Sequence, residues 1–296
     1  MLDDGLRVER LGFDAVWLPD HFFFERAGGE VVETYPEVWT LLSALAVRTE
    51  RVRLGTNVLA ATFRHPALLA KMAGAVQELS GGRFVLGLGA GNQVREHQAF
   101  GLDFAHRVGR FKEYVPIVSR LLEGQTVTHH GRYFQLDEAS LRTVVPAVPM
   151  WLAAGGPQMF ELTARYASGW NMAGGGADPL AIRARYDGFA AACRAAGRDV
   201  ADFAVAKMTF MAVAPDAASA RRMVDELATR GRQTPEALAA RTVVGTPDQI
   251  VAALCTLNDI GVTEHILNVA ESEQWPNYWD AIELLAREVV PLVRGT

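Results

Sequence analysis

Short apolar segments alternate with longer amphipathic segments along almost the whole chain, and this alternation limits the possible folds most. Seven apolar segments have the length and composition of buried strands, and they cover residues 13–18, 52–58, 84–88, 149–153, 169–173, 203–213 and 265–269. Helical spacing is expected at residues 3–11, 37–48, 66–79, 109–122, 157–167, 179–196, 216–230 and 277–290. Strands that alternate with helices pair in parallel, so the sequence predicts an α/β protein.

The chain length favours one large barrel. A chain of 296 residues has the usual size of one α/β barrel domain, so we expect a single domain over residues 1–296. An eight-stranded barrel needs one strand more than the seven counted. The chain begins in the helix that should follow a first strand, so that strand is either absent or replaced by another segment.

The composition excludes several classes of partner. Lys+Arg 29 against Asp+Glu 34 gives a net charge of -5 without a long block of one sign, so neither nucleic acid nor an anionic membrane is expected as a partner. No apolar run is long enough to span a bilayer, and the residues after Met1 lack the basic start of a signal peptide. Cys193 and Cys255 lie in helical segments and fit reduced, packed thiols. We therefore expect a soluble, cytoplasmic protein.

Glycines end the strand at residues 84–88, at Gly87, Gly89 and Gly91. Because they remove side chains from the strand end, a planar ligand could approach the backbone there. A close-packed turn without a ligand is the alternative.

Polar residues follow two other strands, at the edge where a parallel barrel builds its active site. Asp20 and His21 follow the strand at 13–18, and a carboxylate beside an imidazole suits general acid–base chemistry. A capping aspartate and a surface histidine are the alternative. Within the strand at 52–58, Gly55 and the polar residues that follow it indicate a bulge, with a slightly irregular strand as the alternative.

The end of a third strand, at residues 149–153, has the features of a phosphate-binding site. Small residues lead from the strand at 149–153 into a helix that begins at Pro157, and free N–H groups at a helix N-terminus attract anions. A plain helix start is the alternative here. Trp170 fits either a cofactor wall or the core. No metal site is indicated, because His129 and His130 lie on a hairpin expected over residues 126–136 without further ligands at suitable spacing.

Several segments together resemble the luciferase-like monooxygenases, which use flavins or deazaflavins. The similar segments include GFDAVWLPDHF, LGTNVLAATFRHPALLA, FVLGLGAG, EHQAFG, VPMWLAAGGP and ASGWN, in the same order. LGTNVLAATFRHPALLA and LAAGGP are most similar to the enzymes that use coenzyme F420, including F420-dependent glucose-6-phosphate dehydrogenase. The resemblance implies a TIM-type (α/β)8 barrel with an insertion after the GLGAG strand, here lacking the usual first strand, and usually a dimer.

The resemblance also implies roles for individual residues. Asp20 would contact the cofactor ring, and His21 would be the catalytic base. Asn57 and Val58 would be joined by a non-proline cis peptide bond behind the ring. The remaining cofactor-binding residues implied by position are Ala90, Gly91 and Asn92 at the ring and Ala153, Ala154, Gly155 and Gly156 at the phosphate.

The chain departs from the sugar-phosphate dehydrogenases at the substrate. Asn92 replaces a glutamate that acts as an acid there, and an amide cannot transfer a full proton near neutral pH. Ala173 and Gly176 replace a threonine and a lysine that hold the sugar phosphate, and only Arg241 of that set remains. Glucose 6-phosphate is therefore not the expected substrate, and the expected substrate contacts are His21, Trp170 and Arg241.

Three functions remain as hypotheses. The first is an oxidoreductase that transfers a hydride between F420 and a small organic substrate. The second is a two-component monooxygenase that uses reduced FMN, and the third is a flavin-binding relative without catalysis. A homodimer and a flavin or F420 reductase are the expected protein partners.

Overall fold

The structure is a computed structural model that describes residues 1–25, 31–142, 146–172, 174, 176–272, 275 and 277–294. Its contacts divide the chain into two compact units. Unit 1 contains residues 1–10, 14–154 and 162–170, and unit 2 contains residues 11–13, 155–161 and 171–296. Each unit is described by itself, and a single domain over residues 1–296 stays a prediction.

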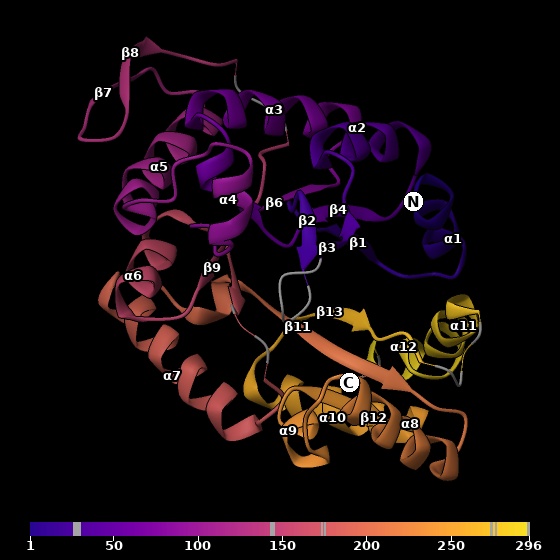
Figure 1. Ribbon diagram of the computed structural model, residues 1–296. Coiled ribbons are helices and arrows are strands. Elements are labelled where there is room, and N and C mark those ends of the chain that lie inside the picture. The colour runs from indigo at the N-terminus through magenta and orange to yellow at the C-terminus, as the bar shows by residue number, and fades with distance from the viewer. Residues whose placement is uncertain are drawn as a thin grey trace. The chain divides into compact units, whose positions relative to one another are not determined.

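Helices and strands alternate as expected (Figure 1). The helices are α1 Leu2–Arg10, α2 Val38–Arg48, α3 Pro66–Leu79, α4 Val94–Ala99, α5 Arg107–Leu122, α6 Pro157–Tyr166, α7 Pro179–Ala195, α8 Ala217–Arg230, α9 Pro235–Ala239, α10 Pro247–Ile260, α11 Tyr278–Glu288 and α12 Val290–Arg294. The strands are β1 Ala15–Leu18, β2 Phe23–Glu25, β3 Val31–Thr34, β4 Arg53–Thr56, β5 Leu59–Ala60, β6 Phe84–Gly89, β7 Val127–His130, β8 Gln135–Ala139, β9 Met150–Ala154, β10 Gly169–Met172, β11 Ala204–Val213, β12 Thr242–Gly245 and β13 Glu264–Val269. Two 3-10 turns lie at Ala61–Phe63 and Val200–Asp202.

Unit 1 is built on a parallel sheet in the order β1-β4-β6-β9, with β5 paired to the end of β6. All six residues of β6 are buried, because FVLGLG offers no polar side chain to solvent. Helices α2 and α3 contact each other and lie side by side in Figure 1. Their starts are set locally, since Glu37 accepts a hydrogen bond from the Thr40 N–H and Pro66 occupies the first turn of α3.

Two tryptophans explain two glycines within these strands. Trp17 on β1 lies against Gly55 on β4, where a Cβ atom would be 2.3 Å from the indole. Trp151 on β9 lies in the same way against Gly169, with a Cβ distance of 2.4 Å. The two indole rings are 5.1 Å apart, so glycine makes room for an aromatic pair.

Unit 2 contains three parallel strands in the order β12-β11-β13, with β11 as the long orange strand in Figure 1. Its helices start at conventional caps: Asp178 caps α7, Asp216 caps α8 and Thr246 forms a capping box with Gln249 at α10. A buried cluster centred on Met223 and Leu227 packs α8.

The expected parallel α/β architecture is confirmed, and most element bounds agree within two residues. The connection from β6 to β9 contains α4, α5 and the antiparallel β7–β8 hairpin, which was expected at residues 126–136. The short β2–β3 hairpin and the short helices α4, α9 and α12 were not expected. The strand expected at 52–58 is divided, because β4 ends at Thr56 and β5 begins at Leu59.

Among the described helices, none combines the length and the apolar character that a membrane span needs. Cys193 is fully buried, and burial raises the pKa of its thiol to about 11. Neither Cys193 nor Cys255 takes part in a disulfide bond among the described residues.

Candidate active site

Asp20 follows β1 and is held by Arg64 from the loop before α3. The two guanidinium nitrogens donate to the two carboxylate oxygens at 2.6 and 3.1 Å, and the Ala60 N–H donates at 3.2 Å. Only 6% of Asp20 is exposed, and this burial raises the pKa of its carboxyl, although Arg64 opposes the shift. Arg64 also pairs with Glu37 at 2.8 Å. These bonds fix the segment after β1 against the end of β5 and the loop before α3.

His21 is oriented by Glu96 rather than by its neighbour Asp20. The imidazole Nδ1 lies 2.9 Å from a Glu96 carboxylate oxygen, and the other oxygen accepts from the N–H groups of Phe22 and Phe23 at 2.7 and 3.2 Å. The Glu96 side chain is 2% exposed, whereas that of His21 is 33% exposed. A carboxylate at Nδ1 favours the tautomer with the proton on Nδ1, which leaves Nε2 as an acceptor.

This arrangement gives His21 the features of a general acid–base residue. One ring nitrogen is fixed by a buried anion, and the imidazole is accessible to solvent. The same group can therefore take a proton at Nε2 and return it. The sequence suggested Asp20 as the carboxylate that acts on this imidazole, whereas the structure pairs Asp20 with Arg64 and places Glu96 of α4 at His21.

The strand-end glycines are each explained by neighbouring protein atoms. A Cβ atom at Gly87 would lie 1.9 Å from the Thr56 carbonyl oxygen, and one at Gly89 would lie 2.8 Å from a methyl group of Val58. Gly91 has φ 84° and packs against Thr62. Close packing, the alternative considered for this motif, therefore accounts for all three glycines.

The peptide bond between Asn57 and Val58 is cis, as the resemblance implied. Both residues are partly exposed, as are Ala90 and Gly91 after β6, while Asn92 is exposed. The contact of Val58 with Gly89 brings the cis peptide next to the end of β6. These partly exposed residues thus lie next to the buried end of β6 within unit 1.

His97 on α4 also packs near the end of β6, and it is 1% exposed. Its Nε2 bonds with the Thr62 hydroxyl at 2.7 Å and its Nδ1 with the Gln93 carbonyl at 2.7 Å. The contact of Thr62 with Gly91 then joins α4 to the end of β6. Helix α4 is therefore held on both sides, which keeps Glu96 at His21.

In unit 2, the expected phosphate site lies at the start of α6. The Gly156 carbonyl accepts from Met159 and Phe160 at 3.0 and 2.9 Å, so α6 begins directly after it. A Cβ atom at Gly156 would meet nothing within 4 Å, and Gly155 is exposed. Of the preceding residues assigned to unit 1, Ala154 is buried and Ala153 is partly exposed.

Two of the expected substrate residues, Trp170 and Arg241, differ in their exposure to solvent. Trp170 is fully buried and donates its indole N–H to the Ala154 carbonyl at 3.0 Å, so it is a core residue, the alternative that the sequence left open. Arg241 is exposed between α9 and β12. Ala173 lies outside the described residues.

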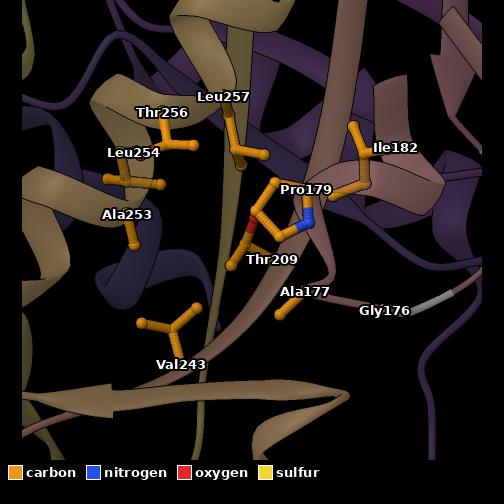
Figure 2. Close-up of a pocket in the computed structure, with 10 residues that line it drawn as sticks. All are labelled: Gly176, Ala177, Pro179, Ile182, Thr209, Val243, Ala253, Leu254, Thr256 and Leu257. Carbon is orange, nitrogen blue, oxygen red and sulfur yellow. The ribbon is translucent and has the colours of Figure 1, made fainter. Parts of the chain in front are cut away.

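Gly176 lines a small cavity of about 80 Å³ in unit 2 (Figure 2). Its wall is mostly apolar, with Ile182 from α7 and Leu254 and Leu257 from α10. The Thr209 hydroxyl is buried without a hydrogen-bond partner among the described residues. The cavity holds no ionisable side chain in its lining, so it does not offer acid–base chemistry.

Three residues of the unit 1 site were not singled out from the sequence: Arg64, Glu96 and His97. Each lies in a segment that contributed to the family resemblance, TFRHPALLA or EHQAFG. Glu96 and His97 lie on the short helix α4, and Arg64 lies in the loop before α3. A polar residue in such a segment is usually exposed, so the sequence alone gave no strong reason to expect these three at the site.

These observations agree with the comparison with known families. A family model described as "luciferase-like monooxygenase" matches residues 5–264. The chain belongs to the luciferase-like monooxygenase family. It is therefore an oxidoreductase of that family.

Curated relatives include F420-dependent enzymes. A 5,10-methylenetetrahydromethanopterin reductase from Methanolobus tindarius is 28% identical over 96% of this chain and 93% of its own length. An F420-dependent glucose-6-phosphate dehydrogenase from Intrasporangium calvum is 38% identical over 178 residues, which are 56% of this chain and 50% of that relative.

Solved structures confirm the fold. An F420-dependent secondary alcohol dehydrogenase in complex with an F420-acetone adduct has a TM-score of 0.83 at 22% identity, covering 99% of this chain and 94% of that chain. An EDTA monooxygenase from Chelativorans sp. BNC1 has a TM-score of 0.82 at 20% identity, with coverages of 99% and 85%. The chain thus has the α/β fold with a parallel sheet that the luciferase-like barrel enzymes share.

Proposed function

We propose that the chain transfers a hydride between coenzyme F420 and a small organic substrate, with His21 as the proton-transfer residue. The observation that carries the proposal is the hydrogen bond between the buried Glu96 carboxylate and the accessible imidazole of His21. Removal of a hydride from an alcohol carbon requires loss of the hydroxyl proton, and a fixed imidazole with a free Nε2 can accept it. The F420-dependent glucose-6-phosphate dehydrogenase among the relatives supports the choice of cofactor.

The residues of unit 1 fit a planar ring. Val58, Ala90 and Gly91 are partly exposed, and Gly91 packs on Thr62, which bonds with the buried His97. When bound, F420 supplies a ring carbon that accepts or donates the hydride. The chain's own contribution is to present backbone to the ring and to hold His21 at the reacting oxygen.

In this proposal Asp20 has a structural role at the site. Both of its oxygens are engaged by Arg64 and Ala60, so its negative charge is already balanced. We assign it the role of fixing the β1 end that carries His21. A direct contact with the ring stays a prediction from the resemblance.

Cofactor titrations provide the first test. We expect F420 to bind at micromolar concentration or tighter, measured by its fluorescence in oxidised and reduced forms, and FMN to bind more weakly. A preference for reduced FMN with oxygen uptake that depends on a flavin reductase would favour a monooxygenase. Binding of neither cofactor would contradict both functions.

Substitution of His21 provides the second test. We expect His21→Ala to abolish turnover of alcohol or enone substrates while F420 affinity changes less than about tenfold, because the residue moves a proton and does not hold the cofactor. His130→Ala is the matched control, since its imidazole is exposed on the β7–β8 hairpin. Retained turnover in His21→Ala would reject His21 as the essential group.

We also propose a homodimer that uses the faces of α2 and α3. Val47, Leu68 and Leu79 are large apolar residues that are 62%, 53% and 50% exposed. Covering such side chains removes apolar surface from water and favours association. Light scattering should show a dimer that Leu68→Glu dissociates, whereas Leu180→Glu on α7, at an 81% exposed position, leaves it intact. A monomeric wild-type chain would contradict this proposal.

A further inference from the structure

The small cavity of unit 2 extends from the core to the surface. It has a volume of about 80 Å³ and is lined by residues of α7, α10 and β11 (Figure 2). Its buried side is formed by Ile182, Leu254 and Leu257, which are 3%, 2% and 6% exposed. Pro179 and Thr256 also line it, and both are exposed. A small molecule can therefore reach the buried wall from the side of these two residues.

One polar atom of the cavity wall has no hydrogen-bond partner. Thr209 on β11 is 4% exposed, and its hydroxyl bonds with no group among the described residues. A buried hydroxyl without a partner is unfavourable, and folded proteins rarely keep one. Because a hydroxyl both donates and accepts, an alcohol or a carbonyl group inside the cavity can satisfy it.

Water fits this wall poorly. At ~10–15 Å³ for each water molecule, a volume of about 80 Å³ corresponds to roughly five waters or more. Each buried water needs two to four polar partners. The wall is mostly apolar, and the Thr256 hydroxyl already donates to the Ala252 carbonyl at 2.9 Å. A single molecule with a short hydrocarbon part and one polar atom matches this wall better than a group of waters.

The surroundings disfavour a charged ligand. Among the described residues, the lining contains no acidic, basic or histidine side chain. Lys207, a buried lysine on the same strand, is 2% exposed, donates to the Met208 carbonyl at 2.6 Å and does not line the cavity. Because an unpaired charge is costly to move out of water, neither an anion nor an ammonium group is expected in this cavity.

We propose that this cavity binds one uncharged molecule of about five non-hydrogen atoms that carries an alcohol or a carbonyl group. The polar group bonds with the Thr209 hydroxyl, and the hydrocarbon part contacts Ile182 of α7 and the leucines of α10. The bound molecule thus joins both helices to β11. All the lining residues belong to unit 2, whereas His21 and Glu96 belong to unit 1. The inference therefore does not depend on the proposed function.

Methyl-group NMR of the purified chain without cofactor tests the site, with 2-butanol as the probe. We expect saturable shifts of the methyl groups of Ile182, Leu254 and Leu257, with a Kd of about 1 mM, which is within the efficiency limit for a ligand of this size. Saturation distinguishes binding in the cavity from a general effect of the alcohol on the solvent.

Thr209→Val removes the hydroxyl and keeps the size of the side chain. It should weaken 2-butanol binding about tenfold, as loss of one hydrogen bond predicts. Xenon makes no hydrogen bond, so it should bind this variant at least as well as the wild type. Thr229→Val, at an exposed position on α8, is the matched control and should keep the wild-type affinity for both probes.

Filling the cavity provides an independent test. Ala253 on α10 lies in the wall, and Ala253→Leu places additional methyl groups inside it. We expect this variant to fold, since leucine suits a helix, and to lose the binding of both 2-butanol and xenon. Ala252→Leu, at an exposed position on the same helix, should bind both as the wild type does.

Three results would overturn the proposal. The first is a wild type whose shifts with 2-butanol do not saturate. The second is equal 2-butanol affinity in Ala253→Leu and Ala252→Leu, and the third is unchanged 2-butanol affinity in Thr209→Val. Should Thr209→Val fail to fold, the comparison of Ala253→Leu with Ala252→Leu decides.

Discussion

Glu96 and His21 are 75 residues apart in the sequence, and their side chains meet at 2.9 Å. The pairing joins helix α4 to the end of β1, and it decides which nitrogen of the imidazole carries the proton. Because Glu96 also accepts two backbone N–H groups of the β1 end, orientation of the ring and shape of the loop depend on one side chain.

Glu96→Gln tests that relationship. A glutamine can present its amide N–H to Nδ1, which favours the opposite tautomer, so we expect kcat to fall by roughly 10²-fold or more with F420 affinity little changed. Nitrogen-15 spectra of the labelled imidazoles should show the proton moving from Nδ1 to Nε2 of His21. Glu50→Gln, at an exposed position, is the control, and equal kcat values for the two variants would contradict the role of Glu96.

The Asp20–Arg64 pair should be important for stability. Arg64→Met leaves a buried carboxylate without its guanidinium, and we expect the free energy of unfolding to fall by ~3–5 kcal/mol. Adding Asp20→Asn should recover part of this loss, since a neutral amide tolerates burial better. Glu37→Gln removes the half-exposed partner of Arg64 and should cost ~1 kcal/mol or less. Urea unfolding of the double-mutant cycle measures the coupling, which would be absent if the pair were only a surface contact.

Two glycines with different surroundings should respond differently to alanine. At Gly87 the new methyl group would lie 1.9 Å from a backbone oxygen of the adjacent strand, so we expect Gly87→Ala to cost ~3 kcal/mol or more, or to prevent folding. At Gly156 nothing lies within 4 Å, and the change should stay within about 0.5 kcal/mol. Equal unfolding midpoints for Gly87→Ala and Gly156→Ala would contradict this prediction, because they would show that β4 and β6 can move apart without loss of stability.

Lys207 should make stability depend on pH in an alkaline window. Its pKa is about 8 in the folded chain and 10.5 in its ordinary state, so between these values the unfolded chain binds more protons and stability rises with pH. We expect the wild type to gain at most ~3 kcal/mol relative to Lys207→Met between pH 8 and pH 10.5 in phosphate-free buffer. Urea unfolding at both ends of this window measures the gain. Identical pH profiles for wild type and Lys207→Met would contradict the burial of a charged amine.

The fold was largely predictable because it depends on local patterns. Helix α3 has the expected bounds at residues 66–79, since Pro66 and the apolar spacing define it within the segment itself. The strand segments were recognisable from apolar runs, but these runs did not show that β4 ends at Thr56 and that β5 begins at Leu59.

The site was less predictable because its pairs are distant in the sequence. His21 was recognisable from its position after a strand, whereas its partner Glu96 lies in a six-residue helix without clear periodicity. The glycines of the β6 end were interpreted in terms of a ligand, but the Thr56 carbonyl and the Val58 methyl group occupy the adjoining space. Which atom fills the space beside a glycine depends on the register of the neighbouring strand.

The Trp17–Trp151 pair gives unit 1 an optical signature. Two indoles with ring centres 5.1 Å apart and planes inclined at 33° are close enough for their excited states to couple. Their far-ultraviolet circular dichroism should therefore contain a paired band from the strong indole transition, and this band should disappear when β1 and β9 separate. The glycines opposite them, Gly55 and Gly169, thus set the chromophore geometry, and the band reports the packing of this core without any added label.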